Sequence, residues 1–390
     1  MATIDYDSLS EDYKDFAYPF AQLFVKGKNL ADSKVGFGIS EIDVDLTSDY
    51  EASIATVRIN KVFDMDRSKF LTDSIKDYSQ LGSQVKIALG YQGKTIEVFR
   101  GFIARVNFVY EKDDMPAVVL TCMDVKGMMM ANNYSKQLTA NCWSAAVKEI
   151  FEQPYYTGIT DPDNGIIKDL KDIYDTPDAQ EAQAGGGTEA TDKTIELVAE
   201  SDYEFVVKAA KKFNYEFFVQ AGQLVFRSAK SDSSIFMEIS PKTGLLELDV
   251  EYDITGLVES VEVRNVNAGK GKLVQSKSKI SNTVSPIVSN TLYKGMSKIY
   301  IDPTAATDND AGYRAKYLVE DVSYRFGTFK AILIGLPDLI PGVFVNLKGL
   351  GGNVNNKFYI TNVRHHLVPD GEYRTVLTGK AATLTTILDV

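Results

Sequence analysis

Cysteine is nearly absent from this sequence, which has only Cys122 and Cys142 in 390 residues. Two cysteines cannot form the disulfide framework of a secreted scaffold in a chain this long, so that class of protein is excluded. We expect both thiols to be free and buried, and we expect the protein to be made and kept in a reducing cytoplasm.

Basic clusters and long apolar stretches are missing as well. Lys and Arg number 42 against 53 Asp and Glu, which gives a net charge of −11 at pH 7. An acidic surface repels phosphates, so we expect no direct binding to nucleic acid. The acidic start MATIDYDSLSEDYKDF lacks the parts of a signal peptide, and no stretch approaches the roughly 20 apolar residues of a transmembrane helix. We therefore expect no membrane insertion.

Residues that do chemistry are scarce. The two histidines, His365 and His366, are adjacent, and on a strand they face opposite sides. Neither has a cysteine or a third histidine at zinc spacing. Geometry alone leaves a Ser-His-Asp triad with His365 open, but the chain has no G-x-S-x-G elbow to support it. The segments DPDNG (161–165) and AGKGK (268–272) lack the spacing of a calcium loop and a phosphate loop. We predict no catalytic residue, no metal and no cofactor.

Strand-forming residues are plentiful. The chain contains 21 Tyr and 20 Phe, and aromatic side chains pack well on a pleated sheet. In EIDVDL, Ile42, Val44 and Leu46 alternate with carboxylates, which predicts a strand with one buried face. Similar alternation covers much of the first 130 residues and of the last 70. The pattern predicts a mainly β protein of the α+β class.

Helices are expected between the strand-rich parts, at 143–153, 200–213 and 310–325. The clearest is ESDYEFVVKAAKKFN, in which Ser201 and Glu204 have the spacing of a capping box and Asn214 ends the helix. A hairpin around Gly222 follows. Residues 157–193 are rich in Asp, Gly, Pro and Ala, so we predict an exposed, mobile loop there.

The same strand–turn–strand pattern occurs twice. FIARVNFVYEKDDMPAVVLT (102–121) aligns without a gap with YITNVRHHLVPDGEYRTVLT (359–378) at an offset of 257. VKIAL (85–89) aligns with VFVNL (343–347) at an offset of 258. Two matched segments in the same order indicate an internal duplication. Two similar domains per chain would let three chains form a ring of six similar units, which adapts a threefold partner to a sixfold one.

The expected domains follow from these patterns. We predict a first β domain at 1–130 and an inserted α+β domain at 131–235. A second, similar β domain would comprise 236–266 and 320–390, with a small insertion at 267–319. Ring contacts are predicted at the two matched apolar strands, namely at Val85, Ile87, Leu89, Val343, Val345 and Leu347.

Two segments carry a resemblance to a known family. ESDYEFVVKAAKKFNYEFFVQAGQLVF resembles the E-S-D-[WY]-x-F helix and hairpin of phage late control protein D and VgrG-like hubs. The segment GLPDLIPGVFVNLKGLGGNVNNKFYITNVRHHL is similar to their closing pattern, G-x-P-x-L-x-P-G-x-x-V-x-L followed by a strand ending in V-x-H. The landmarks here are Pro337, Leu339, Pro341, Gly342, Val345, Leu347, Tyr359, Val363 and His365.

The resemblance implies a homotrimeric baseplate hub. In that family, paired tube-like barrels form a pseudo-sixfold ring between a sixfold inner tube and a threefold spike. The resemblance thus implies that the first β domain (1–130) and the second (236–266 and 320–390) are tube-like β-barrels. VgrG proteins continue into a needle, whereas this sequence ends at TTILDV, so we expect the spike to be a separate protein. The expected partners are this spike, an inner tube or tube-initiator protein, and baseplate wedge proteins of a phage, a bacteriocin or an injection system. The alternatives are a tail-associated cell-wall hydrolase and a carbohydrate-binding baseplate component.

Overall fold

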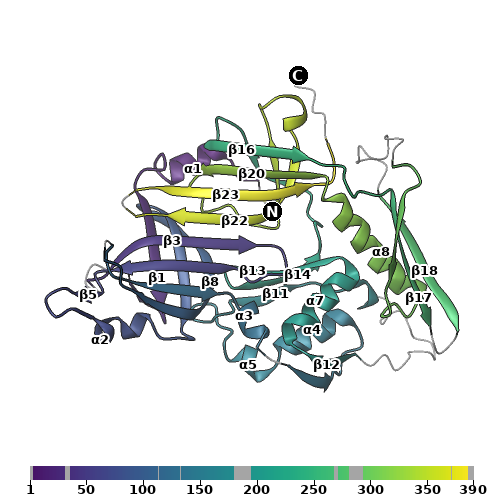
Figure 1. Cartoon of the computed structure of the whole chain (residues 1–390), viewed down its shortest axis with the longest axis horizontal. Helices are drawn as coiled ribbons and strands as arrows, with labels where there is room; N and C mark the ends of the chain where they lie inside the picture. Colours follow the sequence, from purple (N-terminus) through teal and green to yellow (C-terminus); the bar gives the residue numbers. More distant parts are fainter. Residues whose placement is uncertain are drawn as a thin grey trace.

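A computed structural model of the chain describes residues 3–30, 36–112, 114–131, 133–179, 195–267, 271–280, 293–369 and 371–384. These residues, whose arrangement Figure 1 shows, pack around three hydrophobic cores. The largest core belongs to a 13-stranded sheet. The second core lies within residues 125–226 and the third within residues 257–326. The chain is mainly β, as predicted.

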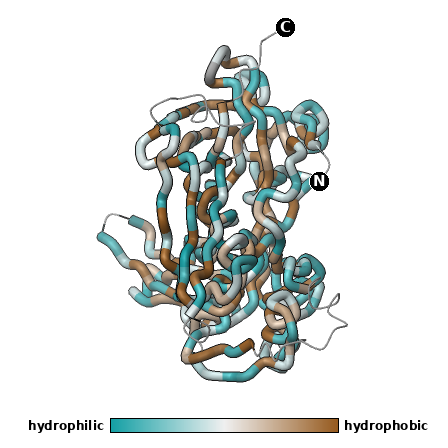
Figure 2. The backbone as a smooth tube through the Cα atoms, turned by 90° about the vertical axis from the view of Figure 1, so that its right-hand side faces the viewer, coloured by the Kyte–Doolittle hydropathy of each residue, from teal (hydrophilic) through white to brown (hydrophobic). Residues whose placement is uncertain are grey.

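The large sheet has the strand order β16-β20-β23-β22-β3-β4-β9-β8-β7-β1-β2, and β15 and β21 branch from it through a pairing of β21 with β22. Brown and teal alternate along its extended segments in Figure 2, because one face of each strand is buried. The strands are β1 (Pro19–Val25), β2 (Lys28–Asn29), β3 (Gly38–Thr47), β4 (Ile54–Asn60), β7 (Gln84–Tyr91), β8 (Lys94–Val109), β9 (Ala117–Met123), β15 (Ile235–Ile239), β16 (Leu245–Tyr252), β20 (Gly327–Ile334), β21 (Phe344–Leu347), β22 (Lys357–Leu367) and β23 (Tyr373–Ala381).

Ten of the 13 strands form two repeats with the same strand order. The first repeat is β3-β4-β9-β8-β7 and the second is β16-β20-β23-β22-β21. In the first repeat, Val106 on β8 lies opposite Leu120 on β9. In the second, Val363 on β22 lies opposite Leu377 on β23. These two residues come 257 positions later in the sequence than Val106 and Leu120.

Irregularities in the ladders occur at the same places in both repeats. The β8–β9 register shifts between Ile103 and Arg105, and the β22–β23 register shifts between Ile360 and Asn362, again 257 residues later. The β3–β4 and β16–β20 ladders also share a shift, after Ile39 and Leu245 respectively. Bulges are specific features of a strand pair, so two matched bulges confirm the predicted duplication.

One detail of the predicted alignment is wrong. Val85 lies opposite Gly101, and Val345 lies opposite Phe358. Because Gly101 and Phe358 are equivalent, Val85 corresponds to Val345 at an offset of 260 rather than 258. A shift by two residues leaves every side chain on the same face of a strand, so the alternation in sequence cannot detect it.

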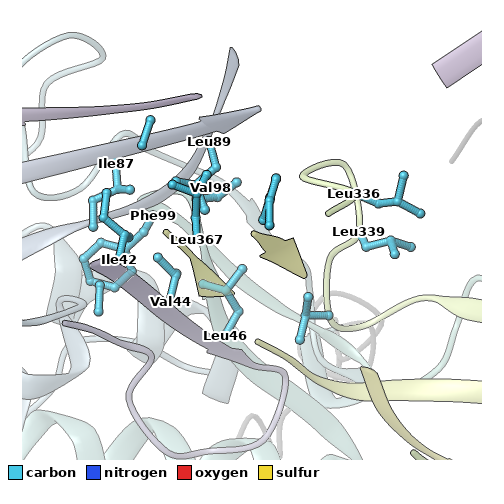
Figure 3. Packing of buried hydrophobic residues seen from close by; sticks show 14 of the residues in the cluster. Ile42, Val44, Leu46, Ile87, Leu89, Val98, Phe99, Leu336, Leu339 and Leu367 are labelled. Atoms are coloured by element: carbon cyan, nitrogen blue, oxygen red, sulfur yellow. The ribbon is translucent and has the colours of Figure 1, made fainter. Parts of the chain in front are cut away.

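The two repeats share one core. β22 of the second repeat pairs with β3, the first strand of the first repeat. Figure 3 shows Ile42, Val44 and Leu46 of β3 in the same cluster as Leu367 of β22 and residues of β7. The N-terminal helix α1 (Tyr6–Asp12) adds a second link between the repeats, because the Tyr13 hydroxyl that follows it donates to Asp338 at 2.8 Å.

The first insertion follows β9 and contains the second core. Its elements are α3 (Lys126–Met129), β10 (Tyr134–Gln137), α4 (Trp143–Phe151), α5 (Pro154–Thr157), β11 (Asp169–Ile173), β12 (Glu196–Glu200), α7 (Asp202–Phe213), β13 (Tyr215–Gln220) and β14 (Gln223–Ser228). The capping box of Ser201 and Glu204, the left-handed Asn214 and the β13–β14 hairpin are all as predicted.

The prediction of an exposed loop over 157–193 is wrong for its first part. β11 pairs in parallel with β14, and Ile166, Ile167 and Ile173 are buried in the second core. These three isoleucines drive burial in a stretch whose average composition is polar. The rest of the predicted loop, from residue 180 to 193, lies outside the described residues.

The second insertion lies between β16 and β20 and contains the third core. It consists of β17 (Ser260–Asn267), β18 (Lys272–Lys279), β19 (Ser297–Ile301) and α8 (Asp308–Ser323). We predicted that residues 236–266 belong to the second barrel, but β17 pairs with β18 and β19 instead. Val261 and Val263 of β17 pack against α8, and this packing assigns the strand to the insertion.

Short elements complete the fold. They are β5 (Phe63–Asp64), β6 (Lys69–Phe70), α2 (Thr72–Ile75) and the 3-10 turns Lys76–Tyr78 and Gly352–Val354. The segment with β5, β6 and α2 lies at the end of the sheet opposite the two insertions (Figure 1). No helix in the described part of the chain is long and apolar enough to cross a membrane.

Candidate functional site

The six residues predicted to make ring contacts are all in the interior of the first core. Val343 is the most exposed of them at 6%, and the other five are at 0%. Their strands are also paired on both sides, β7 by β1 and β8, and β21 by β15 and β22. Neither strand is an edge, so these side chains have no surface to offer to another chain.

The junction between the repeats shows how such sheets join. In this β22–β3 seam, Val363 lies opposite Leu46, His365 opposite Val44 and Leu367 opposite Ile42. All six side chains are buried, with exposures of 3% or less. The inward side of the seam is therefore a dry row of cross-strand pairs, the arrangement that stabilises adjacent strands most.

The other side of the seam is polar. Arg364 donates from Nε and Nη2 to the Asp43 carboxylate at 2.6–2.9 Å, and His366 Nδ1 lies 3.2 Å from the same carboxylate. The hydrogen bond to Asp43 raises the pKa of Arg364, so the pair stays charged. Asn362 Nδ2 donates to Asp45 at 2.5 Å. Opposite charges across the strands thus fix the register of the joint.

Within the large sheet, eight strands lie side by side from β16 through β8. The strands equivalent to those of the seam form the two outer edges of this row. β8 is equivalent to β22 and β16 is equivalent to β3. Residues 105–109 of β8 pair only with β9, and residues 248–251 of β16 pair only with β20, among the described strands. Phe108 and Tyr110 are 44% and 64% exposed, whereas their equivalents His365 and Leu367 are fully buried. Figure 1 shows β16 at the margin of the sheet.

A repeated motif in the sequence marks these strands, and our sequence analysis missed it. EIDVD at 41–45 and ELDVE at 247–251 align at an offset of 206, the same offset that relates the two bulges. Both segments carry three carboxylates on the polar face. The motif is short, and only the pairing of β3 with β22 reveals that it belongs to a joint.

His365 has a structural place in the core. Its Nδ1 lies 3.2 Å from both the Thr375 hydroxyl and the Tyr373 hydroxyl. Burial lowers the pKa of His365 to about 4, so the ring is neutral at neutral pH. His366 lies on the opposite, polar face, as predicted for adjacent strand residues. No group of three or more metal-ligating side chains is found in the described parts of the chain.

The DPDNG segment binds the protein's own cations through its backbone. Arg100, whose side chain is 2% exposed, donates from Nη1 to the carbonyls of Asp161 and Pro162 at 3.2 and 2.9 Å. Lys86 donates to the Asp163 carbonyl at 2.6 Å. The loop therefore fixes the first insertion to β7 and β8.

A buried ion pair fixes the first insertion to the second repeat. Arg227 on β14 donates to Glu216 on β13 at 2.5 Å and to the Gly342 carbonyl at 2.6 Å, and the Tyr359 hydroxyl donates to the same Glu216. Burial raises the pKa of Glu216, and the Arg227 guanidinium opposes that rise. Gly342 has φ +83°, and a Cβ there would lie 2.8 Å from Phe218, so the Pro341–Gly342 turn needs glycine.

A cavity of about 630 Å³ lies between α7 and the second insertion. Two of its cations have carboxylate partners, since Lys212 pairs with Asp310 at 2.8 Å and Arg314 with Asp302 at 3.3 Å. Trp143 on its wall is stacked on Phe205 with ring centroids 5.4 Å apart. The single tryptophan is thus held by the core of the first insertion and is not an exposed platform for a sugar.

The comparisons with known proteins agree with this architecture. A family model described as the Alg8 N-terminal domain matches residues 125–369, more than half of the chain, so the chain belongs to this family. No curated protein sequence matches this chain.

Several solved structures have the same fold. A tail protein from Neisseria meningitidis MC58 superposes with a TM-score of 0.62 at 14% identity, over 93% of this chain and 96% of that one. The 43 kDa tail protein of prophage MuSo2 from Shewanella oneidensis gives 0.63 at 12% identity, over 93% and 98%. A component of the E. coli type VI secretion system, described as structurally similar to T4 bacteriophage tail proteins, gives 0.53 at 11% identity, over 94% and 79%. The fold is that of phage tail proteins.

Proposed function

We propose that this protein is the central hub in the baseplate of a contractile tail or injection machine. Its role is structural: three copies form a ring that joins a threefold spike to a sixfold inner tube and starts tube assembly. The observation that carries the proposal is the duplication, because two repeats with the same strand order and the same bulges give each chain two equivalent units.

The sheet geometry supports a ring with an open centre. Eight strands, from β16 through β8, lie side by side in each chain. Three such chains would contribute more strands than the 16–18 that leave an aqueous channel in porins, so the closed sheet would surround a lumen. The polar face of the seam, with Asp43 and Arg364, would line it, because the opposite face packs in the first core.

The two ends of the sheet suit partners of different symmetry. The β8–β9 and β22–β23 hairpins turn at the same end, which Figure 1 shows at the left. In a ring of three chains this end presents six equivalent hairpins. The two insertions lie at the other end and occur once per chain, so that end is threefold. We assign the inner tube to the hairpin end and the spike to the end with the insertions.

The further partners in this proposal are baseplate wedge proteins around the ring. Assembly would take place in the cytoplasm of the host bacterium, and the finished protein would be part of the particle. The solved tail proteins that share this fold support the structural role. The proposal includes no catalytic step.

The direct test is the mass of the purified protein in solution. Light scattering at rising protein concentration, with and without a spike protein from the same gene cluster, should give three times the chain mass of 43.1 kDa. Electron micrographs of this species should show six similar densities around a central hole. A particle that stays at the mass of one chain under both conditions would exclude the hub function, and hydrolysis of purified peptidoglycan would favour the enzyme alternative.

A further inference from the structure

The internal seam predicts how one copy of the chain binds the next. We propose that the outer edge of β8 forms an antiparallel ladder with the outer edge of β16 of a second copy, in the register of the β22–β3 seam. This inference deepens the proposed function and rests on it, because both require several copies in one ring. It adds the surface and the register, neither of which the ring alone specifies.

The register follows from the equivalences within the chain. β8 and β22 differ by 257 residues, and β3 and β16 differ by 206. Within the seam, Arg364 lies opposite Asp45 and His365 lies opposite Val44. The same joint between copies places Asn107 opposite Glu251, Phe108 opposite Val250 and Tyr110 opposite Leu248.

The apolar face of both edges fits this joint. In the seam, the corresponding side chains of β22 and β3 are buried on both strands. At the outer edges, Phe108 and Tyr110 stay half exposed or more, and Leu248 and Val250 are only partly buried. Phe70 and Phe63 of the β5–β6 segment already contact Phe108 and Tyr110, with ring centroids 5.2 and 5.4 Å apart. A second copy would cover the area of all four residues that stays exposed.

The polar face fits by charge. Glu247, Asp249 and Glu251 give the edge of β16 three exposed carboxylates. β8 presents Arg105 and Asn107, both exposed, on the matching face. The seam's hydrogen bond from Asn362 to Asp45 becomes an ion pair between Arg105 and Glu251. The joint between copies thus has one cation where the seam has Arg364 and His366, so its polar face is weaker.

Each edge alone is unfavourable for a soluble protein. An exposed strand with unpaired backbone groups pairs readily with other chains, and proteins cover or pair such edges. The two edges of this chain differ from each other, so the joint is head to tail and closes into a ring when the rotation permits. Pairing β8 with β16 leaves no free edge among the eight strands from β16 through β8.

Disulfide trapping tests the register. The variant carrying Asn107→Cys and Glu251→Cys places the two thiols on directly opposed residues of neighbouring copies. Opposed residues in an antiparallel pair are about 4.5–5.5 Å apart at Cα, within the range that a disulfide spans. Mild oxidation of the full-length protein should convert most chains into covalent dimers and trimers on a non-reducing gel. The native thiols Cys122 and Cys142 are buried and do not interfere.

The matched control is Asn107→Cys with Glu247→Cys. It moves one thiol four residues along β16, about 13 Å away, and should give no covalent oligomer. A three-chain particle that forms without trapping of the 107/251 pair would overturn the proposed joint and leave the hub function standing. A protein that never exceeds the mass of one chain would overturn both.

Charge exchange gives a second readout that does not depend on new thiols. Glu251→Arg faces Arg105 of the neighbour and should raise the dissociation constant of the ring about two- to ten-fold, the size expected for an exposed pair. Adding Arg105→Glu should restore the original value. Both residues are exposed, so each variant should keep the unfolding midpoint of the parent protein. Equal weakening in the double variant would contradict the joint.

Discussion

Several buried charges in this protein lie at the joints between its parts. Glu216, Arg227 and Tyr359 connect the first insertion to the second repeat. Lys126, which is 0% exposed, donates to the Asp49 carbonyl at 3.2 Å and so connects the first insertion to the β3–β4 turn. Burial lowers the pKa of Lys126, and Asp124 opposes that fall. Removing one partner of such a buried pair strongly destabilises the fold, so each joint can be tested by a single substitution.

We predict that Arg227→Ala destabilises the chain by about 3–5 kcal/mol, because it leaves the Glu216 carboxylate buried without its partner. Urea unfolding followed by circular dichroism measures the change. The control is Arg325→Ala, which removes an exposed ion pair with Asp321 and should cost at most about 1 kcal/mol. Similar losses in the two variants would show that the buried pair does not hold the joint.

We predict that His365 makes stability fall in mild acid. Its pKa is about 4 in the folded chain, below the ordinary value of 6.5, so the unfolded chain binds the proton more readily between these limits. The free energy of unfolding therefore falls as pH drops from 6.5 to 4, by about 3 kcal/mol at most. Urea unfolding of the wild type and of His365→Leu at pH 7, 6 and 5 checks this. A difference between the two proteins that does not change with pH would refute it.

Residue patterns in the sequence predicted the core residues of the joints but not their contacts. The alternation in EIDVDL correctly assigned Ile42, Val44 and Leu46 to the core. It did not indicate that Asp43 binds Arg364 from a strand 321 residues away, because a contact between distant strands depends on their pairing. Buried charged residues such as Lys126 were also missed, since burial of lysine is rare and nothing local marks it.

Helices were the elements best predicted from sequence, because their signals are local. The capping box at Ser201 and the left-handed Asn214 bound α7 as expected. The helix expected at 310–325 is α8, which begins two residues earlier with a second capping box of Thr307 and Asp310. Both boxes satisfy backbone N–H groups that the first turn leaves without partners.

We predict that Ser201→Ala lowers the free energy of unfolding by about 1 kcal/mol, because Ser201 accepts from the Glu204 N–H at 3.1 Å. The matched change Thr307→Ala in α8 should cost a similar amount. Urea unfolding measures both. A loss limited to α8 would mean that the packing of α7 in the second core holds its first turn without the cap.

Strands were less predictable than helices. Alternation identified the matched strands but misplaced β7 against β21 by two residues, because the period of a strand is two. It missed β11, whose sequence DLKDI lies in a polar stretch. It also assigned β17 to the wrong sheet, since its alternating valines fit either one. The partner of a strand depends on the whole fold, and its sequence indicates only which face is buried.

At the scale of the whole molecule, the duplication was predictable from the sequence, and the sheet edges proposed to join copies were not. The aligned hairpins indicated two repeats, and the matched bulges confirm them. The predicted ring contacts fell on the most apolar strands, which the fold uses for its core. An edge is defined by the strand that is absent beside it, so Phe108 and Val250 became candidates only when the order of the sheet was known.

The assignment of the two ends gives the last prediction. A short flexible peptide inserted in the β22–β23 turn, between Asp370 and Gly371, should leave the mass of three chains unchanged and block tube assembly. The reason is steric: the turn lies at the hairpin end and away from the strand edges that join copies. The matched control places the same peptide between Thr255 and Gly256, in an exposed turn beside the second insertion, where tube assembly should continue.

The measurement is tube length by electron microscopy after mixing each hub variant with the inner tube protein. The opposite result, with tubes from the 370/371 variant and none from the 255/256 variant, would reverse the polarity of the hub and leave its ring intact. Loss of tubes in both variants, with the three-chain mass retained, would contradict the assignment of one partner to each end. A partner that matches six units needs six similar hairpins, and the β8–β9 and β22–β23 hairpins of three chains provide them at this end, beside three copies of the β5–β6 segment.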